Sequence, residues 1–470
     1  MPTPAASPTV NAGLVKGLGL LDATTIVMGS MIGSGIFIVS ADIARQVGSP
    51  GLLLVVWLVT ASLTLCAALS YGELAAAMPQ AGGQYVYLRE AYGPLSGFLY
   101  GWTLFMVIQT GTVAAVAVAF AKFTGVLFPA VSDTNVLVAL GPLRITTLQA
   151  LAIAVLVFLT WWNTRGLRYG ALLQNVFTIT KTGALLGLIV LGLFFGSRSD
   201  AGATNLANFW PSNLGWWEGI RLVGVAMVGS LFSSDSWHNV TFTGSEVRNP
   251  KRNLPLALSI GVLSVSALYL ATNWVYLQVL PLEAIQNAPS DRVGTAAAQV
   301  MLGPVAQQVM AIAIMVSTFG CINGLLLAGA RVYYAMSLDG LFFKAVAKLN
   351  PRTHSPNASL VVQCAWASLL CLSGTYNDLL DYVIFAVLIF YALTTSAIFV
   401  LRSKRPDLER PYKAIGYPFV PAFYILCATS ISLLLLIYKP RFTWPGLGLV
   451  MLGVPVYYLW KRYRDGASAA

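Results

Sequence analysis

Long apolar runs repeat along almost the whole chain. An α-helix needs about 20 predominantly apolar residues to cross the hydrocarbon core of a bilayer. Twelve runs reach or approach this length: residues 19–46, 51–78, 95–127, 145–163, 170–197, 217–246, 254–280, 304–336, 358–374, 378–401, 417–438 and 443–460. Only Ser373 to Asn377 separates the ninth run from the tenth. The sequence therefore predicts an all-α membrane protein with twelve transmembrane helices.

The composition excludes an ordinary soluble domain, since 57% of the residues are hydrophobic and only 10% are charged. A net charge of +11 is also found in nucleic-acid-binding proteins, but here the basic residues lie in short loops between apolar runs. We therefore expect a lipid bilayer around the chain and no nucleic acid. The five cysteines fall inside apolar runs without metal-ligand spacing, so we expect no disulfide framework, metal site or cofactor.

The positions of the lysines and arginines predict the orientation. If the N-terminus lies inside, most of the 28 basic residues fall in cytoplasmic loops, which places both termini in the cytoplasm. Met1 to Asn11 lacks the features of a cleaved signal peptide. The predicted organisation is a cytoplasmic tail (1–18), a core of ten helices (19–402), two further helices (403–460) and a second cytoplasmic tail (461–470).

The first run contains an unusual cluster of glycine and serine, Gly29-Ser-Met-Ile-Gly33-Ser-Gly35. Glycine costs a helix about 1 kcal/mol relative to alanine, so the helix is predicted to break here. Exposed backbone at membrane depth is tolerated where it lines a cavity, and amides that begin a helix attract anions. The alternative is that the small residues only allow close helix packing. The candidate binding residues are Met31, Ile32, Gly33, Ser34 and Gly35.

The sixth run carries a second predicted break at Ser233-Ser-Asp-Ser236. Serine and aspartate side chains compete for backbone hydrogen bonds, which weakens a helix. Because the second break lies five spans after the first, an odd number, the two halves of the core would have opposite orientations. This arrangement is typical of an inverted repeat with discontinuous helices, and it places a solute site at the membrane midplane.

Several side chains of the sixth run are candidates for the same site. Asp235 is costly at membrane depth and could face an amine of the solute, pair with another residue or cap a helix end. His238 could relay protons, although a neutral, hydrogen-bonded histidine is the more common role. Carbonyl groups beside these residues suit an ammonium group. The candidate residues are Phe232, Ser233, Asp235, Trp237 and His238.

Lys181 lies at the centre of the fifth run. A charged lysine there costs at least about 2.5 kcal/mol unless it faces protein or water, and it is too far from either span end to reach the surface. We expect its ammonium group to contact backbone carbonyls of the broken first helix, in the place of a sodium ion in a related transporter. Ser317 and Thr318 of the eighth run are the predicted additional partners.

Several stretches together resemble the amino acid, polyamine and organocation transporter superfamily, and most closely its L-type amino acid transporter branch. The resemblance covers roughly residues 15–460. It rests on Gly29–Phe37, Tyr71–Pro79 (YGELAAAMP), Gly82–Tyr87 (GGQYVY), Glu246–Pro255 (EVRNPKRNLP) and Arg405–Pro411 (RPDLERP) with Gly416–Pro418 (GYP).

This resemblance implies a five-plus-five inverted repeat with two further helices and sodium-independent exchange of amino acids by alternating access. By position, Ser34 and Gly35 match the carboxylate-binding turn, Phe232 matches the aromatic gate and Lys181 matches a lysine that replaces a sodium site. Asp235 and His238 depart from the family pattern, so the side-chain preference is open. Animal members bind a heavy chain through a cysteine after the third span. Residues 127–145 contain none, so no disulfide-linked partner is expected.

We therefore expect a prokaryotic plasma-membrane exchanger of neutral L-amino acids. The alternatives are an antiporter of cationic amino acids or polyamines and a proton-coupled symporter. An enzyme or receptor is disfavoured because the spans contain no paired catalytic acids and no soluble domain is present.

Overall fold

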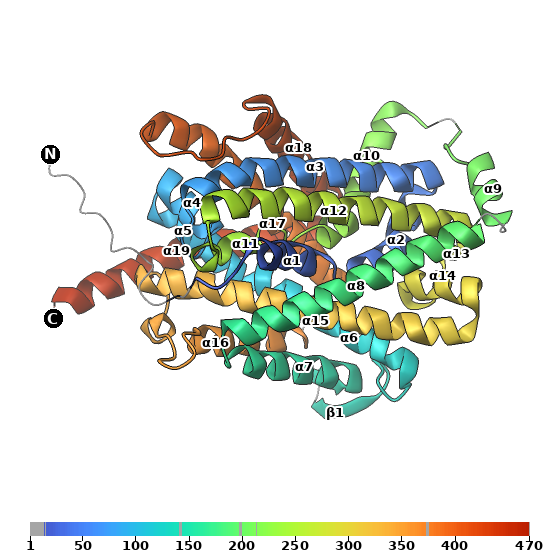
Figure 1. Ribbon diagram of the computed structural model, residues 1–470, viewed down its shortest axis with the longest axis horizontal. Coiled ribbons are helices and arrows are strands. Elements are labelled where there is room, and N and C mark those ends of the chain that lie inside the picture. The colour runs from blue at the N-terminus through green and yellow to red at the C-terminus, as the bar shows by residue number, and fades with distance from the viewer. Residues whose placement is uncertain are drawn as a thin grey trace.

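The computed structural model describes residues 14, 16–140, 143–196, 200–212, 214–372 and 376–469. Almost all of them form one bundle of helices (Figure 1). Most of the predicted N-terminal tail lies outside the described residues, as do residues 373–375 of the predicted break between the ninth and tenth spans.

A helix, or a pair of helices, occupies each predicted span. In chain order these are α1 (Leu20–Met31) with α2 (Gly35–Val47), α3 (Pro50–Ala77), α5 (Pro94–Thr103) with α6 (Gln109–Leu127), α7 (Thr147–Asn163), α8 (Leu167–Gly196), α10 (Trp216–Ser233) with α11 (Asn239–Phe242), α12 (Pro250–Val279), α15 (Pro304–Leu338), α16 (Asn357–Leu370), α17 (Tyr376–Lys404), α18 (Phe419–Tyr438) and α19 (Pro440–Ala469). By length and composition, eight helical segments of the described chain are able to cross a membrane.

Shorter elements connect these helices. Near one end of the bundle lie the hairpin β1 (Val136–Leu140) and β2 (Leu143–Thr146), together with α9 (Asp200–Ala207), α13 (Leu282–Gln286) and α14 (Val293–Leu302) (Figure 1). Near the other end lie α4 (Gln84–Tyr92) and the end of α19. The π-helical segment η1 (Leu104–Ile108) joins α5 to α6, and the 3₁₀ segments are η2 (Gly244–Glu246), η3 (Pro289–Asp291) and η4 (Lys344–Ala347).

Local sequence explains where the second span begins. Ser49 precedes α3 in extended conformation and its side chain accepts a hydrogen bond from the Leu52 amide, while Pro50 takes the first helical position. The helix then packs along α12, where the rings of Trp57 and Tyr269 meet edge to face at 5.5 Å. This contact places Tyr269 against the interior of the bundle, beside α1.

The short helix α1 lies near the centre of the bundle in Figure 1. It contacts α12, α8 and α15, so long helices surround it. Most of its residues are buried, and the same is true of α2. The predicted glycine-rich break is therefore enclosed by protein at the centre of the molecule.

Candidate functional site

The first predicted break is present. Helix α1 ends at Met31 and α2 begins at Gly35, so Ile32, Gly33 and Ser34 lie outside both helices. Ile32 has ψ of 88°, which turns the chain out of the helical path. Among the described residues, no hydrogen bond outside the helices uses the amide of Gly33 or Gly35 as donor. These two amides lie at the start of α2, where the helix dipole favours a negative charge.

Lys181 donates hydrogen bonds to backbone carbonyl groups at the break in the first span. Its Nζ atom donates to Gly29 O at 2.5 Å and to Ile32 O at 2.6 Å, and Ser317 O accepts at 3.4 Å. The lysine side chain is 1% exposed, so this ammonium group does not reach the surface. The position predicted for Lys181, against the broken first helix, matches this geometry.

Helix α15 supplies further donors to the same carbonyls. The Ser317 hydroxyl donates to Ile32 O at 3.2 Å and to Gly33 O at 3.1 Å, and Cys321 Sγ donates to Ser30 O at 3.1 Å. The hydroxyl of Thr318 instead donates to Ile314 O and Met315 O of its own helix. Of the two predicted partners, Ser317 therefore contacts Lys181 and the break, whereas Thr318 stabilises α15.

The second predicted break is also present. Helix α10 ends at Ser233 and α11 begins at Asn239, so residues 234–238 lie outside both helices. Ser236 has a φ of 67°, in the left-handed region that favours glycine. A side chain here carries backbone strain of order 1 kcal/mol, so surrounding contacts must hold the turn.

The two breaks contact each other directly. The single O–H proton of Tyr269 in α12 is shared between Met31 O at 2.9 Å and Ser233 O at 3.1 Å, which joins the end of α1 to the end of α10. A Cβ atom on Gly35 would lie 2.1 Å from Ser233 Oγ, so α2 approaches α10 as closely as a glycine allows. The predicted site residues of the first and sixth spans thus belong to one region.

Asp235 and His238 share one partner from α17. The Tyr391 hydroxyl donates to Asp235 Oδ1 and lies 2.5 Å from His238 Nδ1. The Trp237 ring packs against Tyr391 and against Tyr71 of α3, with centroid separations of 5.3 and 4.8 Å. Aromatic side chains from three spans therefore hold the second break.

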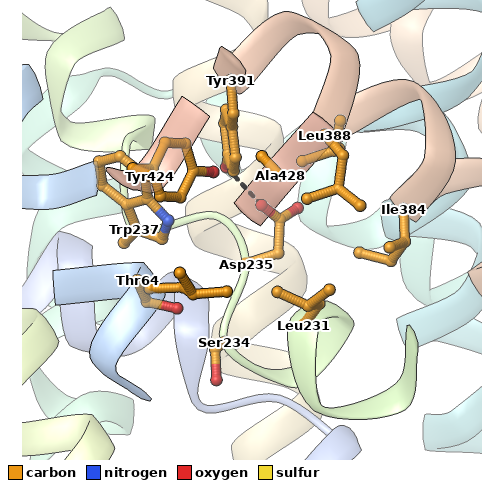
Figure 2. Close-up of a pocket in the computed structure, with 12 residues that line it drawn as sticks. Thr64, Leu231, Ser234, Asp235, Trp237, Ile384, Leu388, Tyr391, Tyr424 and Ala428 are labelled. Atoms are coloured by element: carbon orange, nitrogen blue, oxygen red, sulfur yellow. Dashed lines mark hydrogen bonds between the residues drawn. The ribbon is translucent and has the colours of Figure 1, made fainter. Parts of the chain in front are cut away.

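A small cavity of about 20 Å³ lies beside this cluster, and Figure 2 shows the residues that line it. Asp235 points into it together with Trp237, Tyr391 and Tyr424, and Leu231, Ile384 and Leu388 form its apolar wall. This volume accommodates about one water molecule. The cavity is lined by one carboxylate and by aromatic and apolar side chains.

Comparison with known proteins decides which family has this architecture. The model of the family described as amino acid permease matches residues 18–456. The chain belongs to the amino acid permease family. It is accordingly a multi-span transporter of the amino acid, polyamine and organocation superfamily and not an enzyme.

Animal transporters resemble the permease over almost its whole length. The mouse b(0,+)-type amino acid transporter 1 is 30% identical and covers 96% of this chain and 89% of its own. The human large neutral amino acids transporter small subunit 2 is 31% identical, with 97% and 83% covered. The mouse Asc-type amino acid transporter 1 is 30% identical, with 96% and 82% covered. All three relatives are named as amino acid transporters.

Two glutamates near span ends pair with basic residues of the permease, as their positions beside basic loops suggest. Glu246 accepts from Arg331 Nε at 2.9 Å, and both side chains are 2% exposed. Glu73 accepts from Arg402 at 2.7 Å and also from the amide of Ala414. The Glu246–Arg331 pair joins η2 to α15. Glu73 joins α3 to α17 through Arg402 and to the loop after α17 through Ala414.

Sequence reasoning missed the tyrosines that hold both breaks of the permease. Tyr269 and Tyr391 lie within apolar runs, where a tyrosine is common in any membrane helix. The spacing along one helix does not indicate which distant carbonyl or carboxylate a phenol will meet. Only the packing of α12 and α17 against the breaks identifies their partners.

Proposed function

We propose that this permease exchanges neutral L-amino acids by alternating access and without sodium. The observation that carries the proposal is the Lys181 ammonium group, held by the carbonyls of Gly29 and Ile32. A cation tethered to α8 occupies the place beside the broken helix where carbonyl oxygens would otherwise suit a bound metal cation. The protein thus supplies its own positive charge to the break.

The two breaks suit the two ends of an amino acid. In this proposal the free amides of Gly33 and Gly35 and the neighbouring Met31, Ile32 and Ser34 bind the carboxylate. The ammonium group binds carbonyls at the end of α10, around Phe232 and Ser233. Trp237, Asp235 and His238 line the side-chain end of the site. The breaks lie close enough for one small zwitterion, because Gly35 and Ser233 are in contact.

Exchange is tested with purified permease in liposomes. Vesicles preloaded with unlabelled alanine, serine or leucine should accumulate the labelled amino acid, while empty vesicles should not. Replacing external sodium by choline should leave the rate unchanged. Uptake that requires sodium, or that is equally fast into empty vesicles, would contradict sodium-independent exchange. A proton symporter would instead respond to an imposed pH gradient in the absence of internal substrate.

A second candidate function is antiport of cationic amino acids or polyamines, and Asp235 favours it. Its carboxylate points into the cavity of Figure 2, where it is within reach of a positively charged group. Competition separates the two functions: lysine, agmatine or putrescine should displace a labelled substrate better than leucine if the cationic function holds. Neutral competitors should be stronger if the neutral function holds.

We also propose that the permease lies in the plasma membrane of a prokaryote with both termini in the cytoplasm and without a disulfide-linked partner. The distribution of basic residues supports this orientation, and residues 127–145 contain no cysteine. Cysteine labelling of intact cells tests it: a cysteine at Lys348 should be protected from an impermeant maleimide, and one at Asp133 should react.

A further inference from the structure

A large basic cavity lies away from the two breaks, where α8 begins. Its volume is about 720 Å³, in the range of ligand sites. Three arginines line it: Arg165 between α7 and α8, Arg248 between η2 and α12, and Arg352 between η4 and α16. The start of α1 completes its wall through Asp22. Four segments that are distant in sequence therefore surround one space.

The acidic groups of this cavity already have partners within the protein. Asp22 accepts from the Gly19 amide at 2.8 Å and from Asn175 Nδ2 at 2.7 Å. The Glu246 carboxylate accepts from Arg331 and is 2% exposed. Neither carboxylate faces a lining arginine as its ion-pair partner. The cavity therefore keeps an excess of positive charge.

The three lining arginines lack such partners. Within the described parts of the chain, none of their guanidinium groups forms an ion pair or donates a hydrogen bond. Arg165 makes a different contact: its Cζ atom lies 4.4 Å from the centre of the Trp161 ring. A stacked guanidinium still presents its N–H groups in the plane, where a phosphate accepts them.

The cavity also borders the surface that faces lipid. The apolar membrane segment of α8 begins at Tyr169, which lines the cavity and is 53% exposed. Leu172, one turn further, lines it too and is 61% exposed. Exposed aromatic residues beside arginines at the end of a span are typical of the headgroup layer. Basic pockets at this depth bind the phosphate groups of anionic lipids.

We propose that this cavity binds a phosphate-bearing anion through Arg165, Arg248 and Arg352. The bound anion connects the three loops that carry these arginines. The Arg248 amide already donates to Leu18 O at 2.8 Å, so the anion strengthens the attachment of the segment that precedes α1. Two sources carry the same chemistry: the headgroup of an anionic lipid, and a soluble phosphate compound.

Binding is measured on purified, delipidated permease in detergent, without transport, so the outcome is independent of the proposed exchange. Native mass spectrometry compares phosphatidylglycerol with phosphatidylcholine of the same acyl chains, and thermal unfolding follows a titration with pyrophosphate. The variants are Arg165→Gln, Arg248→Gln and Arg352→Gln, singly and combined. Arg144→Gln, an exposed arginine on the hairpin at the other end of the bundle, is the matched control.

The permease should bind phosphatidylglycerol at least tenfold more tightly than phosphatidylcholine. The triple variant should lose this preference, each single variant should weaken it and Arg144→Gln should retain it. Stabilisation by pyrophosphate alone, absent in the triple variant, would support the site and identify a soluble ligand. If neither probe binds preferentially, or if the variants bind like the wild type, the proposal is wrong. Should the triple variant fail to elute as a monodisperse protein, the single variants decide.

Discussion

Gly35 and Ser233 hold the two interrupted helices in direct contact. A Cβ atom on Gly35 would lie 2.1 Å from Ser233 Oγ, 2.7 Å from its Cβ and 2.9 Å from its Cα. The last of these is a backbone atom, which a rotamer change cannot move. The contact therefore depends on the absence of a side chain at residue 35.

Gly35→Ala should separate the ends of α2 and α10. Overpacking of this kind costs about 1–3 kcal/mol, and we expect exchange to fall at least tenfold. Gly183→Ala is the control, since no atom lies within 4 Å of the added Cβ and alanine favours the helix. Thermal unfolding and exchange in liposomes measure the two effects. Wild-type activity of Gly35→Ala would show that the close approach is dispensable.

Lys181→Ala should abolish exchange while the protein remains folded. The substitution removes the donor for Gly29 O and one of the two donors for Ile32 O, which the Ser317 hydroxyl also contacts, and leaving the buried Gly29 carbonyl unpaired costs about 1–3 kcal/mol. Lys344→Ala, an exposed lysine in η4, should behave like the wild type. Uptake by proteoliposomes, normalised to folded protein from size-exclusion chromatography, tests the prediction. Unchanged uptake by Lys181→Ala would show that Lys181 is not required for exchange.

Tyr391→Phe should weaken substrate binding more than it slows turnover. Without the hydroxyl, Asp235 loses the hydrogen bond from α17 and His238 Nδ1 loses its contact with Tyr391, so α17 no longer holds the second break in one geometry. We expect KM for exchange to rise about tenfold, equivalent to ~1.4 kcal/mol. Tyr458→Phe, on the exposed face of α19, is the matched control. A change confined to the maximal rate would contradict this role.

Arg331→Met should destabilise the permease strongly because it leaves the Glu246 carboxylate buried without a partner. Breaking a buried ion pair from one side costs about 3–5 kcal/mol, and the double variant Glu246→Gln/Arg331→Met should recover part of this loss. The exposed pair Lys251–Glu409 gives the comparison, since Lys251→Met should cost less than about 1 kcal/mol. Equal melting temperatures for Arg331→Met and Lys251→Met would be the contrary result.

The sequence predicted features that depend on composition along one helix. Gly33 and Gly35 weaken a helix wherever they occur, and the cost of a buried lysine predicted that Lys181 needs carbonyl partners. Features that depend on packing between helices were not predictable. Thr318 and Ser317 look equivalent as neighbours on α15, yet only Ser317 contacts the first break. The left-handed conformation of Ser236 was likewise hidden, because a serine does not signal a positive φ.

The phenol of Tyr269 has a mechanical consequence. Its oxygen lies 2.9 and 3.1 Å from one carbonyl oxygen on each interrupted helix, and a contact stretched to about 3.6 Å is no longer a hydrogen bond. Met31 and Ser233 therefore either move together or separate only when one of these two hydrogen bonds breaks. Movement of either helix during a transport cycle therefore changes a hydrogen bond to Tyr269 of α12.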